Sequence, residues 1–131
     1  MSYRFWLFIT GLLGFSAVAA GALGRHMLNA EGVMLKAYES GQLFHALHTL
    51  AILGVTVLMA ASEGRRNALA DWTLQIAAFA FLGGILCFSG GIYVQVGLGL
   101  QSSVNIVPTG GVLFLTGWAA LALSAFGFRR E

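Results

Sequence analysis

Charged side chains are scarce in this sequence. Asp, Glu, Lys and Arg make up 9% of the 131 residues, whereas about a quarter of the residues in a soluble protein are charged. So few charges do not cover the surface of a soluble globule. The formal net charge of +2 is also too small and too scattered for a nucleic-acid-binding surface. We therefore expect a protein surrounded by a lipid bilayer, with no nucleic-acid partner.

The motifs of the common enzyme classes are missing as well. The sequence has no phosphate-binding P-loop, no dinucleotide fingerprint, no hydrolase elbow and no paired-carboxylate site. Its single cysteine, Cys87, excludes an intrachain disulfide. We predict a non-catalytic protein with no cofactor and no resident metal. A membrane enzyme that uses His45 is the alternative.

The sequence contains three long runs without a charged residue. They cover residues 5–24, 40–62 and 72–128. A helix needs about 20 apolar residues to cross roughly 30 Å of hydrocarbon, so the first two runs each make one crossing. The third run is interrupted by a polar stretch at residues 97–105, so it makes two crossings. A soluble four-helix bundle would need polar outer faces, which the segments around Leu7, Phe81 and Leu121 lack.

The sequence thus predicts an all-α, integral membrane four-helix bundle that forms a single membrane domain over residues 1–131. The predicted spans cover about residues 3–24, 43–61, 72–98 and 106–128. Pro108 falls in the first turn of the fourth span, where its missing N–H is tolerated. Trp118 lies deep in that span, and its indole N–H is expected to find a partner inside the bundle.

Residues 25–42 form the longest charged connection between spans. Asn29 is suited to cap a helix, and apolar residues from Met34 to Gly41 recur at helical spacing. We predict a short interfacial helix between spans 1 and 2. The alternative is that these residues are the extended first turns of the second span.

Basic residues favour one orientation of the four spans. Both termini and the second loop share one side of the membrane and carry Arg4, Arg65, Arg66, Arg129 and Arg130, whereas Arg25 and Lys36 lie on the other side. Basic residues are enriched in cytoplasmic loops. We therefore predict that both termini are cytoplasmic, in the plasma (inner) membrane if the protein is bacterial.

Polar residues gather on the second span and just before it. Several of them lie within about 60° of His45 on a helical wheel. The candidate polar seam or ligand pocket comprises His26, Tyr38, Glu39, Gln42, His45, His48 and Thr49. In one interpretation the histidines hydrogen-bond carbonyls or hydroxyls across helix interfaces, because polar groups in lipid need partners.

Two further interpretations of these residues stay open. The stripe with Tyr38, Gln42, His45, Thr49 and Thr56 is also suited to line the path of a small transporter or channel, since ionisable residues inside a membrane are often functional. A haem site, or a copper or zinc site made by His26, His45 and Glu39, is the third interpretation.

Small residues recur along the predicted spans and are expected to let helices approach closely in lipid. The helix-packing candidates are Gly21, Gly24, Gly83, Gly84, Gly90, Gly91, Gly110, Gly111 and Gly117. We expect these glycines to pack the spans together, or to pack the protein against a second copy of itself or another membrane protein.

Several local patterns also resemble a known family. They are Gly21–Leu28, Leu43–Leu47, Leu86–Tyr93, Val107–Gly111 and Gly117–Trp118. In this order they resemble the DUF423 family of small membrane proteins, which includes the eukaryotic transmembrane protein 256. The resemblance covers nearly the whole chain, although Arg25–Leu28 stands where the family is expected to have Ala-His-Gly-Leu. It implies four membrane helices and no established biochemical activity.

Overall fold

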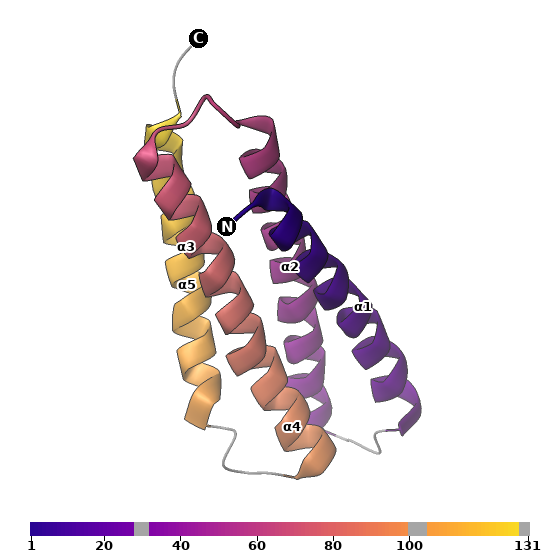
Figure 1. Cartoon of the computed structure of the whole chain (residues 1–131). Helices are drawn as coiled ribbons and strands as arrows, with labels where there is room; N and C mark the ends of the chain where they lie inside the picture. Colours follow the sequence, from indigo (N-terminus) through magenta and orange to yellow (C-terminus); the bar gives the residue numbers. More distant parts are fainter. Residues whose placement is uncertain (28–31, 100–104, 129–131) are drawn as a thin grey trace.

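The computed structural model describes residues 1–27, 32–99 and 105–128 of the chain, and the side chains of residues 25–27 are not part of that description (Figure 1). Its elements are α1 (Tyr3–Met27), α2 (Val33–Ala61), α3 (Ala68–Gly84), the π-helical turn η1 (Ile85–Ser89), α4 (Gly90–Leu98), α5 (Val107–Ser124) and the 3-10 turn η3 (Ala125–Gly127). Because α3, η1 and α4 follow one another without a break, they form one long segment.

Within the described residues, four helical segments are long and apolar enough to cross a membrane. They are Tyr3–Gly24, Val33–Ala61, Ala68–Leu98 and Val107–Gly127. The predicted all-α architecture with four spans is therefore confirmed. Pro108 lies in the first turn of α5, as expected from its missing N–H.

The four segments lie side by side, with the N-terminus, the turn η3 and the loop after α2 towards the same end (Figure 1). The most extensive contact joins α3 to α5, and α1 packs mainly on α2. The apolar core includes Ile52 of α2, Leu74 and Phe81 of α3, and Phe114 of α5. Trp6 closes this core from α1 and is completely buried.

The predicted interfacial helix between the first two spans is wrong for the residues that the structure describes. Val33 to Gln42 form the first turns of α2 and continue directly into the span. Nothing interrupts the helix there, because Gly41 is buried against Ile92 and Tyr93 instead of ending it. The second span thus starts at Val33 instead of residue 43, and the predicted cap Asn29 lies outside the described residues.

The third span also differs from its predicted course. It begins at Ala68 instead of residue 72, because Asn67 caps α3 by accepting a 3.1 Å hydrogen bond from the Ala70 N–H. The turn Ile85–Ser89 in its middle has π-helical geometry, which the sequence pattern did not predict. Such turns insert one extra residue into a helix and often occur at functional sites.

Hydrogen bonds tie both ends of the chain to the start of α3. The Trp6 indole N–H donates to the Gln75 side-chain oxygen at 2.9 Å, and the Gln75 amide donates to the Met1 carbonyl at 2.7 Å. The Asn67 N–H donates to the Gly127 carbonyl at 2.9 Å. The two outer helices α1 and α5 are therefore held in register with α3 at this end.

Five of the nine predicted glycines do pack helices within the chain. A Cβ atom at Gly84, Gly110 or Gly117 would overlap atoms of the facing helix, so these glycines allow α5 to lie close to α3 and η1. On α1, Gly21 and Gly24 likewise face Gln42 and Tyr38 of α2. Gly83 touches only the tip of Leu113, and Gly91 is buried. Gly111 has no atom of another segment within 4 Å, and Gly90 meets only the Ile85 carbonyl of its own segment. Gly90 and Gly111 thus make no close contact with another described helix of this chain, and their packing against a second copy or another protein stays a prediction.

Adjacent glycines on α5 provide a matched test of this packing. We expect Gly110→Ala to lower the free energy of unfolding by about 1–3 kcal/mol, because its Cβ would collide with the Phe88 backbone. Gly111→Ala should leave stability unchanged or raise it by up to about 1 kcal/mol, since alanine is the better helix former. Unfolding curves in mild detergent measure both values. Equal losses in the two variants would contradict the close contact.

Candidate functional site

The buried polar residues of α2 point to different neighbours. Its buried side chains include Tyr38, His45, His48, Thr49 and Thr56. The predicted single seam therefore divides into groups that contact α1, α4 and α5, and each group has its own hydrogen-bond partners.

His48 lies in the packed centre of the bundle with 1% of its surface exposed. Its Nδ1 is 2.8 Å from the Phe44 carbonyl oxygen, and its Nε2 is 3.1 Å from the Trp118 indole nitrogen. A carbonyl only accepts and an indole N–H only donates. The ring is therefore neutral, with its hydrogen on Nδ1. It also stacks on Phe114 with ring centroids 3.6 Å apart, so His48 is fully used in packing α2 against α5.

His45 is also buried, with 4% of its surface exposed, but it contacts different helices. Its Nε2 is 3.4 Å from Ser16 Oγ on α1, and its Nδ1 is 3.3 Å from the Tyr93 hydroxyl on α4. Both distances are at the long end for hydrogen bonds. The His45 ring is thus held by two hydroxyls from separate segments, and more loosely than His48.

Tyr38 and Gln42 both contact the α1 side of α2. The Tyr38 hydroxyl donates to the Ala20 carbonyl at 2.6 Å, and its ring lies 5.2 Å from that of Tyr93. Gln42 reaches Gly21, where an added Cβ would be 3.0 Å from Gln42 Nε2. These side chains thus join α1 to the first turns of α2.

The other residues of the predicted seam do not share one site. The Thr49 hydroxyl donates to the His45 carbonyl at 2.8 Å, so it bonds within its own helix, and Thr56 does the same with Ile52 at 2.7 Å. Glu39 is exposed. His26 belongs to the last turns of α1, and its side chain lies outside the described part of the chain.

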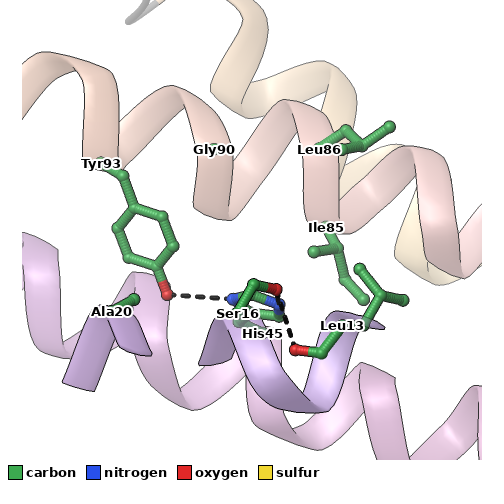
Figure 2. A pocket seen from close by; sticks show the side chains of 8 residues that line it. All are labelled: Leu13, Ser16, Ala20, His45, Ile85, Leu86, Gly90 and Tyr93. Atoms are coloured by element: carbon green, nitrogen blue, oxygen red, sulfur yellow. Dashed lines mark hydrogen bonds between the residues drawn. The ribbon is translucent and has the colours of Figure 1, made fainter. Parts of the chain in front are cut away.

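A pocket of about 230 Å³ lies beside His45 (Figure 2). Its lining residues are Leu13, Ser16 and Ala20 of α1, His45 of α2, Ile85 and Leu86 of η1, and Gly90 and Tyr93 of α4. Figure 2 shows the Tyr93 side chain reaching from α4 to the His45 ring. Among the predicted seam residues whose side chains are described, His45 alone lines this pocket.

Sequence reasoning missed two polar residues of the pocket. Neither Ser16 nor Tyr93 is among the site residues predicted from the sequence. The available signal was that Tyr93 is an isolated polar ring in an apolar span, beside Gly90 and Gly91. The π-helical turn that contributes Ile85 and Leu86 has no such signal.

Metal-binding geometry is absent from the residues that the structure describes: no three His, Cys, Asp or Glu side chains come together there. Glu39 does not line the pocket beside His45. The third member of the predicted set, His26, has a side chain outside the description. The described geometry therefore gives no support to a metal site made by these three residues.

The fold and this site define a class: a small integral membrane protein with four spans and a pocket between its helices. The family model described as a protein of unknown function, DUF423, matches residues 20–111. The matched part includes α2 with both of its histidines and most of the pocket. The chain belongs to the DUF423 family, and the predicted resemblance is confirmed.

Curated relatives are similar over nearly their whole length. The UPF0382 inner membrane protein YgdD of Escherichia coli K12 is 35% identical over all of this chain and 96% of its own length. A UPF0382 membrane protein of Haemophilus influenzae is 36% identical over 92% of this chain and 93% of its own length. The UPF0382 membrane protein SAB0533 of Staphylococcus aureus is 29% identical over 95% of this chain and 98% of its own length. No solved structure matches the chain.

The Trp118 indole N–H was expected to find a partner inside the bundle, and this partner is His48. Mutation of the two residues tests the contact. Trp118→Phe leaves the buried Nε2 of His48 without a donor, which should lower the free energy of unfolding by about 1–3 kcal/mol. His48→Phe with Trp118→Phe should cost less than the two single losses added together, because neither partner is then left unpaired.

Denaturant unfolding in mild detergent measures this double-mutant cycle. Trp72→Phe is the control, because Trp72 is 70% exposed. Strictly additive losses at His48 and Trp118 would contradict a hydrogen bond between the two side chains.

Proposed function

We propose that the chain is a non-catalytic membrane protein that binds a small amphipathic molecule from the bilayer in the pocket beside His45. The observation that carries the proposal is the composition of this pocket, whose apolar walls surround three polar side chains, Ser16, His45 and Tyr93. Binding sites for small molecules are typically apolar cavities with a few convergent polar groups.

The rim of the pocket suits entry from the lipid. Leu86 is 61% exposed and Ser16 is also exposed, while both lie inside membrane-spanning segments. A molecule dissolved in the bilayer therefore reaches the pocket without crossing the packed core. His45 lies at its inner wall and supplies the deepest polar contact.

The geometry of Ser16 favours binding over catalysis. A serine nucleophile needs its hydroxyl hydrogen directed at a general base. Ser16 Oγ instead donates to the Leu13 carbonyl at 3.0 Å, a shorter contact than its 3.4 Å separation from His45 Nε2. The other nitrogen of His45 faces the Tyr93 hydroxyl and not a carboxylate. Ser16 and His45 thus lack the arrangement that activates a nucleophile.

The contacts of α2 also favour binding over transport. A path along α2 would need polar groups free to exchange partners along the helix. The hydroxyls of Thr49 and Thr56 bond to their own helix, and His48 is stacked and bonded between Phe114 and Trp118. The pocket is therefore better suited to hold a molecule than to pass one across the membrane.

Orientation and self-association complete the proposal. The excess of arginine at the end with the termini and the loop after α2 supports cytoplasmic termini, and the Escherichia coli relative is named an inner membrane protein. A second copy or another membrane protein is the expected partner, on surfaces other than the glycines that α1, α3 and α5 already use within the chain.

Filling the pocket tests whether it binds a molecule. Gly90 lines the pocket together with Leu86 and Tyr93, and an added Cβ there would meet only the Ile85 carbonyl oxygen, at 3.8 Å. Gly90→Leu should therefore abolish retention of a bound molecule while the protein stays folded. Native mass spectrometry in mild detergent should detect added mass on the wild type. Gly54→Leu is the matched control, because Gly54 faces open space on α2. Equal retention in both variants would contradict the proposal.

Single introduced cysteines test the orientation. In a Cys87→Ala background, Lys36→Cys and Glu63→Cys place exposed thiols at opposite ends of α2. A membrane-impermeant maleimide applied to spheroplasts should label the cysteine at position 36 directly and the one at position 63 only after lysis. The reverse pattern would overturn the predicted orientation.

A further inference from the structure

We propose that the molecule bound beside His45 is a hydrogen-bond donor, such as a long-chain alcohol, and not a ketone, ester or carboxylate. This inference rests on the binding function proposed above and specifies its ligand class. It follows from the direction in which the hydrogen atoms of Ser16, His45 and Tyr93 point.

The hydroxyl of Ser16 fixes the direction of the first hydrogen bond. Ser16 has one hydrogen, and two acceptors compete for it: the Leu13 carbonyl at 3.0 Å and His45 Nε2 at 3.4 Å. Serine inside a helix usually donates to a carbonyl three or four residues earlier, and the shorter contact has this geometry. Ser16 Oγ is therefore an acceptor towards His45, and Nε2 carries the ring hydrogen.

The tautomer of His45 then fixes the role of Tyr93. A neutral imidazole has one donor and one acceptor nitrogen, so Nδ1 is the acceptor when Nε2 carries the hydrogen. The Tyr93 hydroxyl lies 3.3 Å from Nδ1 and donates to it. The hydrogens run in one direction, from Tyr93 to His45, then to Ser16 and to the Leu13 carbonyl. His45 thus has the opposite tautomer to His48.

This order leaves acceptors, and no side-chain donors, facing the pocket. The hydrogens of Ser16, His45 and Tyr93 are all used within the chain of hydrogen bonds, while the Tyr93 oxygen keeps lone pairs free. The remaining lining side chains are apolar: Leu13, Ala20, Ile85 and Leu86. A ligand O–H or N–H therefore finds a partner at Tyr93 without breaking any existing bond.

A ligand with only acceptor atoms does not gain in the same way. A carbonyl or ether oxygen must draw the Tyr93 hydrogen away from His45 Nδ1, which leaves that nitrogen unpaired in a buried position. The cost of an unsatisfied buried group is as large as the gain from one new hydrogen bond. Discrimination of a donor from an acceptor should be about fivefold, the factor expected for one net hydrogen bond.

Two photoreactive probes test this ligand class. They are hexadecan-1-ol with a diazirine in its chain and the methyl ether of the same molecule, in which a methyl group replaces the hydrogen that the alcohol donates. The full chain in lipid nanodiscs is irradiated with each probe, and peptide mass spectrometry gives the labelled fraction of the peptide that contains Leu86. We expect the alcohol to label this peptide about fivefold more than the ether.

Two variants make the result specific. His45→Phe frees the Tyr93 hydrogen for a ligand acceptor, so ether labelling should rise and the ratio should approach one. Gly90→Leu fills the pocket and gives the background for both probes. Equal or greater labelling by the ether in the wild type would overturn the donor inference and leave the binding function intact. Labelling by neither probe above the Gly90→Leu background would overturn both.

Discussion

Polar groups in the hydrocarbon layer have no water to bond, so they must find partners within the protein. This constraint acts most strongly on α2, the span with the two buried histidines. His48 accepts a hydrogen bond from the indole N–H of Trp118 on α5, and Tyr38 donates one to the Ala20 carbonyl on α1. His45 contacts one hydroxyl from α1 and another from α4. Each of these hydrogen bonds determines which face of a neighbouring helix turns towards α2. The orientation of the other helices therefore depends on α2.

Close approach of the helices depends on glycine, and its distribution explains where the pocket forms. On α5, Gly110 and Gly117 bring the backbone against Phe88 and Phe81, so this side of the bundle is filled. On α1, Gly21 and Gly24 receive Gln42 and Tyr38 of α2, while Gly11 and Gly14 meet no other segment within 4 Å. The space beside His45 lies between the middle of α1 and the π-helical turn. It is filled neither by a close approach of two helices at a glycine nor by an α2 side chain packed on a glycine of α1.

The membrane architecture was predictable because it depends on local properties: charge-free runs set the spans, and the depth of Trp118 required an internal partner. The site was less predictable because it depends on the neighbours of each residue. His45 and His48 are three residues apart and share a predicted face, yet one borders a pocket and the other is stacked in the core. Gly110 and Gly111 likewise differ only in what faces them. No sequence signal marked the π-helical turn.

The two histidines of α2 report directly on this arrangement of hydrogen bonds. Nitrogen-15 NMR of histidine side chains, in lipid nanodiscs, distinguishes a protonated ring nitrogen from a bare one. The chain has three histidines, and the variants His26→Gln and His45→Phe assign their signals. His48 should be neutral with its hydrogen on Nδ1, because Nε2 accepts from Trp118. His45 should be neutral with its hydrogen on Nε2, because Nδ1 accepts from Tyr93. The same tautomer at both positions, or a charged ring at His48, would contradict the arrangement described.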